Sequence, residues 1–170
     1  MRSYRTAGLV SVLALVTACA PKPAAPPDTD AVRSALTAQE RKGVMALADK
    51  DTAALAAVFT DGATWIMQDA STFKGHAAIA KGANALFGSF DSLTIGALTI
   101  QGLVVISDTQ ALTFSHLAFT MTMKGQKKPQ AYSNPFADYW VKGADGVWRI
   151  AYEINAGGVV PAAAVPATRH

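Results

Sequence analysis

The feature that most constrains the fold is the succession of β-strand patterns in the C-terminal half of the chain. From Leu93 onward, runs rich in β-branched and aromatic residues follow one another as LTIGALTI, GLVVI, TQALTFSHLAFTMTM, QAYSNPFADYWV and VWRIAYEIN. The turn sequences SDT, KGQKK and KGADG separate the last of these runs. Because strands joined by short turns pair in antiparallel order, the sequence predicts an antiparallel sheet.

Helical patterns precede these strands. Pro27 and the acidic residues between Asp28 and Asp30 provide the chemistry of a helix start. The predicted helices cover about residues 30–49, 51–59 and 76–87, and two short strands are predicted at residues 63–67 and 71–75. Helices first and an antiparallel sheet second indicate an α+β fold in which the helices cover one face of the sheet.

The first predicted helix has an apolar face that is interrupted in its middle. This face contains Val32, Ala35, Leu36, Gln39, Gly43, Ala46 and Leu47. Gly43 would allow the helix to approach the sheet closely, which is an explanation by packing alone. Alternatively, Gln39 and Gly43 border a cavity between the helix and the sheet.

The turn positions predict which side chains share a face of the sheet. If the turns centre within KGQKKP and at Ala144, even-numbered residues of the last three strands face the helices. This register pairs His116 with Asp138 and Trp140 with Trp148 across neighbouring strands. On the opposite, solvated face it places Thr113, Ser115, Ser133, Arg149 and Glu153.

The predicted register leaves a conflict in one strand. Leu117, Phe119, Met121 and Met123 fall on the solvated face although all four are apolar. Either a β-bulge near Leu117 reverses the alternation, or a second subunit covers this part of the sheet. We favour the second subunit, and therefore expect a homodimer.

The pair of His116 and Asp138 is the sharpest candidate for chemistry. A carboxylate bonded to one imidazole nitrogen leaves the other nitrogen available as a general base. The same two residues could also be a buried polar pair that satisfies itself, because no nucleophile or second acid is evident beside them. The predicted wall of a ligand pocket around them consists of Gln39, Trp65, Phe114, Tyr132, Asn134 and Tyr152.

The first residues have the pattern of a secretory signal. Arg2 and Arg5 precede an apolar stretch at residues 7–16, which is shorter than the roughly 20 residues that span a bilayer. The sequence LVTAC that follows resembles a bacterial lipobox, in which Cys19 would receive a diacylglycerol. Alternatively, Ala18-Cys19-Ala20 fits an ordinary signal peptidase site, which would release a soluble periplasmic protein.

Charge and residue types exclude several classes of partner. The chain has 15 Lys and Arg against 12 Asp and Glu, and removal of Arg2 and Arg5 leaves a formal charge of +1. A nearly neutral chain without a basic stripe argues against nucleic-acid binding. The three histidines are scattered, the single cysteine is assigned to lipid, and no phosphate-binding glycine loop is present. We therefore expect no metal and no cofactor.

Three ordered segments resemble one known group of proteins. LADKDTAALAAVFTDGATWI, FKGHAAI and DYWVKGADGVWRIAYEIN resemble, in this order, segments of the SnoaL-like, ketosteroid-isomerase-like members of the nuclear transport factor 2-like superfamily. The resemblance implies a cone-shaped curved sheet wrapped on helices, a pocket at its mouth and, in many members, a dimer through the outer sheet surface. The positions of the isomerase machinery fall on Met67, Gly43 and near Pro135, so that activity is not implied.

Together these observations predict an envelope lipoprotein that faces the periplasm, most simply from the outer membrane. Its expected parts are a signal peptide (1–18), a Pro- and Ala-rich tether (19–29), a SnoaL-like domain (30–156) and a C-terminal tail (157–170). The expected function is to bind a small apolar ligand in the cone. The alternatives are an isomerase, dehydratase or hydrolase using His116 and Asp138, and a dimeric envelope module without a working pocket.

Overall fold

The computed structural model describes residues 27–156 and 160–161. The predicted signal peptide, the lipid site at Cys19 and most of the C-terminal tail lie outside the described residues. The helices are α1 (Thr29–Asp49), α2 (Thr52–Ala57) and α3 (His76–Phe87), close to the predicted ranges. None of the helices in the described part of the chain is both long and apolar enough to span a membrane.

Local side-chain chemistry sets where the first two helices begin. The Asp28 carboxylate accepts hydrogen bonds from the backbone N–H groups of Asp30 and Ala31, and Asp51 accepts one from Ala54. Each aspartate thereby satisfies N–H groups that have no partner within the helix. α1 ends at its C-cap Lys50, whose backbone is left-handed (φ 56°), and the cap at Asp51 then starts α2 as a separate helix.

The strands form one mixed sheet in the described residues. Six strands follow the spatial order β2-β1-β6-β5-β4-β3, and β7 pairs with β5 off this path. Their bounds are β1 (Phe59–Ile66), β2 (Thr72–Lys74), β3 (Phe90–Ser107), β4 (Gln110–Met123), β5 (Gln130–Lys142), β6 (Trp148–Asn155) and β7 (Val160–Pro161). The α+β class is confirmed, but β1 pairs with β6 in parallel, so the sheet is not purely antiparallel.

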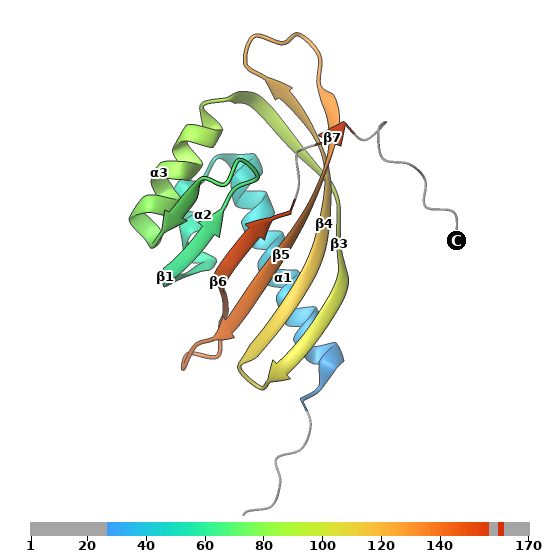
Figure 1. Cartoon of the computed structure of the whole chain (residues 1–170). Helices are drawn as coiled ribbons and strands as arrows, with labels where there is room; N and C mark the ends of the chain where they lie inside the picture. The colour runs from blue at the N-terminus through green and yellow to red at the C-terminus, as the bar shows by residue number, and fades with distance from the viewer. Residues whose placement is uncertain (1–26, 157–159, 162–170) are drawn as a thin grey trace, which may run out of the picture.

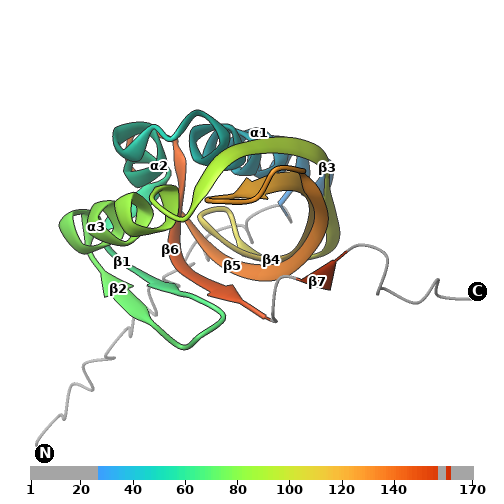
Figure 2. The same cartoon turned by 90° about the horizontal axis from the view of Figure 1, so that it is seen from above.

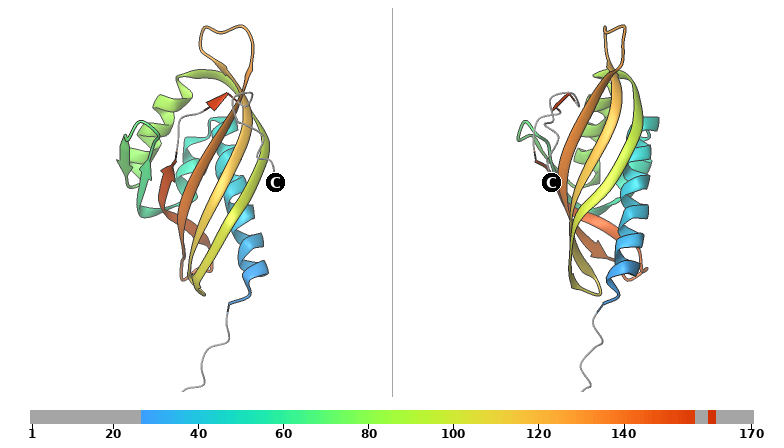
Figure 3. Two further views of the ribbon diagram at one scale, coloured as in Figure 1. Left: turned by 45° about the vertical axis from the view of Figure 1, so that its right-hand side comes forward. Right: turned by 90° about the vertical axis from the view of Figure 1, so that its right-hand side faces the viewer.

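The sheet is strongly curved and the helices cover its inner face. Figure 1 shows the long strands β3, β4 and β5 bending past α1. Seen from above, they curl round an interior that α1, α2 and α3 close on the remaining side (Figure 2). α1 runs beside β3 along the length of the molecule (Figure 3). The core therefore lies inside the curve, between the helices and the inner sheet face.

The predicted register between β4 and β5 is wrong. Thr113 pairs with Asp138, and His116 pairs with Pro135. The cause is the turn: Gly125 has a positive φ of 78°, and the Gln126 N–H donates to the Met123 carbonyl in a tight turn immediately after β4. The connection therefore centres earlier than expected. An odd shift in pairing exchanges the two faces of a strand, so odd-numbered residues of β4 face inward.

This shift resolves the conflict over the apolar residues of β4. Leu117, Phe119 and Met121 are buried in the core, and Thr113 and Ser115 are buried beside them. A second subunit is not needed to cover Leu117, Phe119 and Met121. The sequence-based reason for a dimer interface at these residues is therefore removed.

A β-bulge between β5 and β6 reverses, part-way along β6, which side chains point toward the helices. Trp140 pairs with Ile150, whereas Asp138 pairs with Glu153, so Ala151 is an extra residue on β6. Trp140 and Trp148 are both buried on the covered face as predicted, but they are not direct partners. Beyond the bulge, Glu153 turns inward and Tyr152 turns outward, the reverse of the prediction for both residues.

Candidate ligand-binding site

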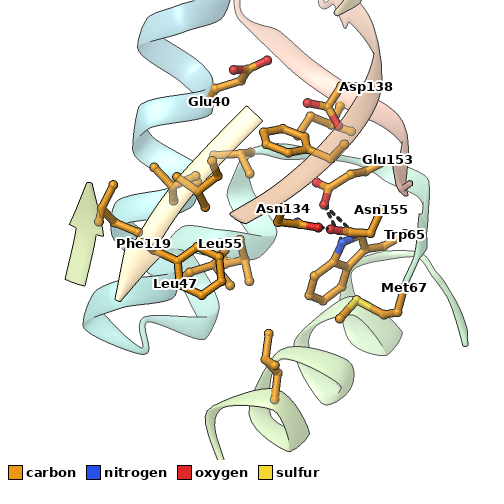
Figure 4. Close-up of a pocket in the computed structure, with 18 of the residues that line it drawn as sticks. Glu40, Leu47, Leu55, Trp65, Met67, Phe119, Asn134, Asp138, Glu153 and Asn155 are labelled. Carbon is orange, nitrogen blue, oxygen red and sulfur yellow. Dashed lines mark hydrogen bonds between the residues drawn. The ribbon is translucent and has the colours of Figure 1, made fainter. Parts of the chain in front are cut away.

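A cavity of about 140 Å³ lies between α1 and the inner face of the sheet. Its walls are mostly apolar side chains from both layers, among them Val44, Leu55, Phe59, Leu117, Phe119 and Phe136. The volume is close to that of an engineered apolar cavity of about 150 Å³ that binds benzene. The cavity can thus hold a molecule, or part of one, of about the size of a single ring (Figure 4).

Glu40 brings a carboxyl group to the cavity from the middle of α1. Its Oε1 accepts hydrogen bonds from Ser115 Oγ at 2.8 Å and from Thr113 Oγ1 at 3.0 Å. The indole N–H of Trp140 in turn donates to Thr113 Oγ1. Burial raises the pKa of Glu40 above its ordinary value, and the two hydroxyl donors oppose this shift.

Asp138 brings a second carboxyl group from β5. Its side chain is only 1% exposed, and neither carboxyl oxygen has a hydrogen-bond partner among the described residues. Burial raises the pKa of Asp138 well above its usual range, and the negative charges of Glu153 and Glu40 raise it further. In Figure 4, Asp138 and Glu40 reach toward the space from opposite sides.

Glu153 supplies a third carboxyl group from β6. Its Oε1 accepts hydrogen bonds from Trp65 Nε1 at 2.7 Å and from Asn155 Nδ2 at 3.1 Å. Burial raises the pKa of Glu153 to about 7, the two donors lower it, and the charge of Glu40 raises it. A carboxyl group with a pKa near 7 can both give and take a proton at neutral pH.

The structure brings only some of the predicted site residues together. Gln39, Gly43, Trp65, Asn134 and Asp138 line the cavity. A Cβ added at Gly43 would lie 3.4 Å from Val58 Cγ2, which is an ordinary van der Waals contact, so Gly43 is a cavity border and is not required by close packing against the sheet. The Asn134 amide N–H donates to Asn155 Oδ1 at 2.7 Å.

The other predicted site residues do not line this cavity. Tyr132 is on the inner side of β5, stacked on Phe119 with ring centres 5.5 Å apart, but it is not part of the cavity wall. His116, Phe114 and Tyr152 lie on the outer sheet face, the last two about half exposed. His116 Nε2 hydrogen-bonds Ser133 Oγ, so the predicted pair of His116 and Asp138 is wrong.

Sequence reasoning missed Glu40 and Glu153. For Glu40 a signal existed, because Leu36, Glu40 and Val44 form an i, i+4 row in which both neighbours are apolar. For Glu153 there was no comparable signal, because its inward direction depends on the bulge at Ala151.

The described acidic residues do not gather into a metal-binding cluster. Across residues 27–156, no three His, Cys, Asp or Glu side chains come together closely enough to hold a metal ion.

Comparisons with known proteins agree with this architecture. The model of the SnoaL-like domain matches residues 41–152, more than half of the chain. The chain belongs to the SnoaL-like domain family. No curated protein matches the sequence.

Several solved structures of low sequence identity share the fold of this chain. A ketosteroid isomerase-like protein from Erwinia carotovora is 20% identical, with a TM-score of 0.63 over 71% of this chain and 92% of that one. A hexachlorocyclohexane dehydrochlorinase from Novosphingobium barchaimii is 15% identical, with a TM-score of 0.67 over 79% and 92%. A nuclear transport factor 2-like superfamily protein from Salmonella enterica is 16% identical, with a TM-score of 0.65 over 84% and 99%.

Proposed function

We propose that this SnoaL-like protein binds a small, mostly apolar molecule in the cavity inside the cone. The observation that carries the proposal is the buried, unpartnered carboxyl group of Asp138 at an otherwise apolar cavity. An apolar concavity with a few convergent polar groups is the usual form of a small-molecule site. Leaving a carboxyl group buried without a partner is unfavourable for the fold itself, which supports a role in binding.

Binding can be tested with toluene and benzyl alcohol as ring-sized probes, followed by calorimetry and by thermal denaturation. Leu117→Phe places extra volume on the cavity wall and should remove binding. Leu112→Phe makes the same change on the same strand but on the outer face, and should leave binding intact. If neither probe binds, or if both variants bind equally well, the ligand pocket is refuted and an envelope module without a working pocket becomes the better description.

A second candidate function is acid–base catalysis, and the pair formed by Asp138 and Glu153 favours it. The two residues are direct cross-strand partners, and burial raises the pKa of both. One protonated and one ionised carboxyl group can transfer a proton to and from a bound molecule. This pair replaces the predicted pair of His116 and Asp138 in the alternative of an isomerase, dehydratase or hydrolase.

Exchange of the α-protons of cyclohexanone in deuterated water would test this second function. We expect the protein to accelerate the exchange over buffer, Asp138→Asn to abolish the acceleration, and His116→Ala to preserve it. An exchange rate no faster than in buffer would count against proton abstraction from a ring-sized ketone.

We propose further that the protein is an envelope lipoprotein that faces the periplasm. The support is the signal-like N-terminus ending in LVTAC, followed by the Pro- and Ala-rich segment. Intact-mass analysis of the membrane-purified protein should show diacylglycerol on Cys19. An unmodified N-terminus would instead indicate the soluble periplasmic alternative.

The homodimer also remains a proposal, now with a different surface. On the outer sheet face, Val104, Leu112, Tyr139 and Tyr152 form one cross-strand row, and Phe114 and Ile154 lie in the next. Four of these six side chains are about half exposed. Light scattering should show a dimer that Phe114→Asp dissociates; a monomeric wild-type protein would refute it.

A further inference from the structure

Four buried oxygen atoms have no hydrogen-bond partner among the described residues. They are Glu40 Oε2, Asn134 Oδ1 and both carboxyl oxygens of Asp138. All three residues line the cavity, and Asp138 is only 1% exposed to solvent. Because buried acceptors without donors are unfavourable, these atoms indicate where a bound molecule supplies donors.

The hydrogen-bond donors on this part of the wall are already in use. Trp65 Nε1 donates to Glu153, Asn134 Nδ2 donates to Asn155, and Asn155 Nδ2 donates to Glu153 and to the Ile66 carbonyl. When Asp138 is ionised, these residues and its carboxylate therefore present only acceptors to the cavity. A ligand that is itself rich in acceptors finds few complementary groups here.

The charge of the cavity wall has one sign. Three elements each contribute an acid to the wall, Glu40 from α1, Asp138 from β5 and Glu153 from β6. The hydroxyl groups of Thr113 and Ser115 on β4 are not part of the wall and donate to Glu40. None of the described residues that line the cavity is Lys, Arg or His. Because the effective dielectric constant inside the protein is low, an acid without a counter-charge is destabilised far more here than it would be in water.

We infer that the cavity selects a small organic cation, a primary or secondary ammonium group carried on an apolar body of about one ring. The inference depends on the proposed ligand binding and specifies its chemical class. An ammonium group has N–H donors and no acceptor, which complements the unpartnered oxygens. Trp65 and Phe136 also line the cavity, and an aromatic ring attracts a cation that lies over its face.

Binding of such a cation is coupled to the protonation of the wall. Burial and mutual repulsion raise the pKa of Asp138 and Glu153, so the pair holds protons near neutral pH. A bound cation favours the ionised carboxyl groups, and these protons are then released. Affinity should therefore rise with pH until the ligand amine loses its own proton.

The test compares three probes that share one ring and differ in their polar group: benzylamine, benzyl alcohol and benzoate. Titration calorimetry of the purified full chain at pH 7.5 should give at least tenfold tighter binding of benzylamine than of benzyl alcohol, with no binding of benzoate. Repeating the benzylamine titration in two buffers of different ionisation enthalpy should reveal proton release.

Two variants show whether the cation sits beside Asp138. Asp138→Asn removes the buried acid while keeping its shape, and should weaken benzylamine at least tenfold without weakening benzyl alcohol. Asp145→Asn removes the same charge from an exposed turn outside the cavity, and should change neither affinity. Benzylamine binding that is insensitive to Asp138→Asn would overturn the inference.

The outcomes separate this inference from the proposed function. If benzyl alcohol or benzoate binds as tightly as benzylamine, ligand binding stands and the selection of a cation is refuted. If none of the three probes binds, the ligand pocket and the cation fall together. Tight benzylamine binding without proton release would contradict the coupling to Asp138 and Glu153.

Discussion

Asp138 and Glu153 are direct cross-strand partners on the covered face of the sheet. No positively charged side chain among the described residues lowers the pKa of either carboxyl group. Directly opposite residues in a sheet have Cβ atoms about 5 Å apart, so the two acids cannot both be ionised without repulsion. This pair costs the fold stability and is best explained by what it does in the cavity.

The stability of the protein should fall as pH rises through neutrality. The folded-state pKa of Glu153, about 7, is higher than the ordinary 4.5, so the folded protein holds this proton more tightly than the unfolded chain. The stabilising contribution is complete below about pH 4.5 and is lost as pH rises through about 7, on the order of 3 kcal/mol in all. Urea denaturation at several pH values measures it, and Glu153→Gln should flatten the profile over that window.

Asp138→Asn should stabilise the protein at pH 8 by about 1 kcal/mol or more. The amide has the shape of the carboxyl group but no charge, so the burial cost and the repulsion from Glu153 and Glu40 are removed. Asp145→Asn is the matched control, since it removes an exposed ion pair with Arg149, keeps an oxygen that can accept from the Val147 N–H, and should cost less than about 1 kcal/mol. A loss of stability in Asp138→Asn would show that the carboxylate has a partner in the fold.

Two leucines of β4 test the register directly. Leu117 is buried in the core, whereas Leu112 lies on the outer face. We expect Leu117→Ala to lower the free energy of unfolding by about 2–5 kcal/mol, and Leu112→Ala to lower it by about 1 kcal/mol or less. Chemical denaturation of the two variants gives the comparison, and the reverse order would restore the register predicted from the sequence.

His116→Ala should leave ligand binding unchanged. The side chain is on the outer sheet face, with Ser133 as its hydrogen-bond partner, and the sheet separates it from the cavity. The expected loss of stability is about 1 kcal/mol, the contribution of one hydrogen bond. Calorimetry with benzyl alcohol measures the affinity, and a large loss of binding would mean that His116 reaches the ligand by another route.

The elements of this fold could be predicted because their signals are local. Asp28 and Asp51 are N-caps that depend only on the next few residues, and the three predicted helices lie close to α1, α2 and α3. The turns after β3, β4 and β5 also lie where glycine and polar residues gather. β3 was expected as two pieces, but it forms one strand across Gln101.

The site was predictable only in part, because it depends on register. Trp65 and Asn134 were expected at the pocket and line the cavity, because their side chains point to the inner face in the observed pairing as well. His116, Phe114 and Tyr152 were also expected there, and each lies on the other face. A shift of pairing by an odd number reverses every side chain of β4 at once.

The amino-acid sequence by itself determined the α+β class, the helix positions, the approximate location of the loops, and the burial of the two tryptophans of the last hairpin, because these follow from capping, periodicity and side-chain size over short stretches. Which acids meet inside the cone was decided by tertiary structure alone. A tight turn at Gly125 and one extra residue at Ala151 set the pairing of whole strands. Each of these two features changes the backbone at only one or two residues. Both nevertheless decide which face of a strand the helices cover.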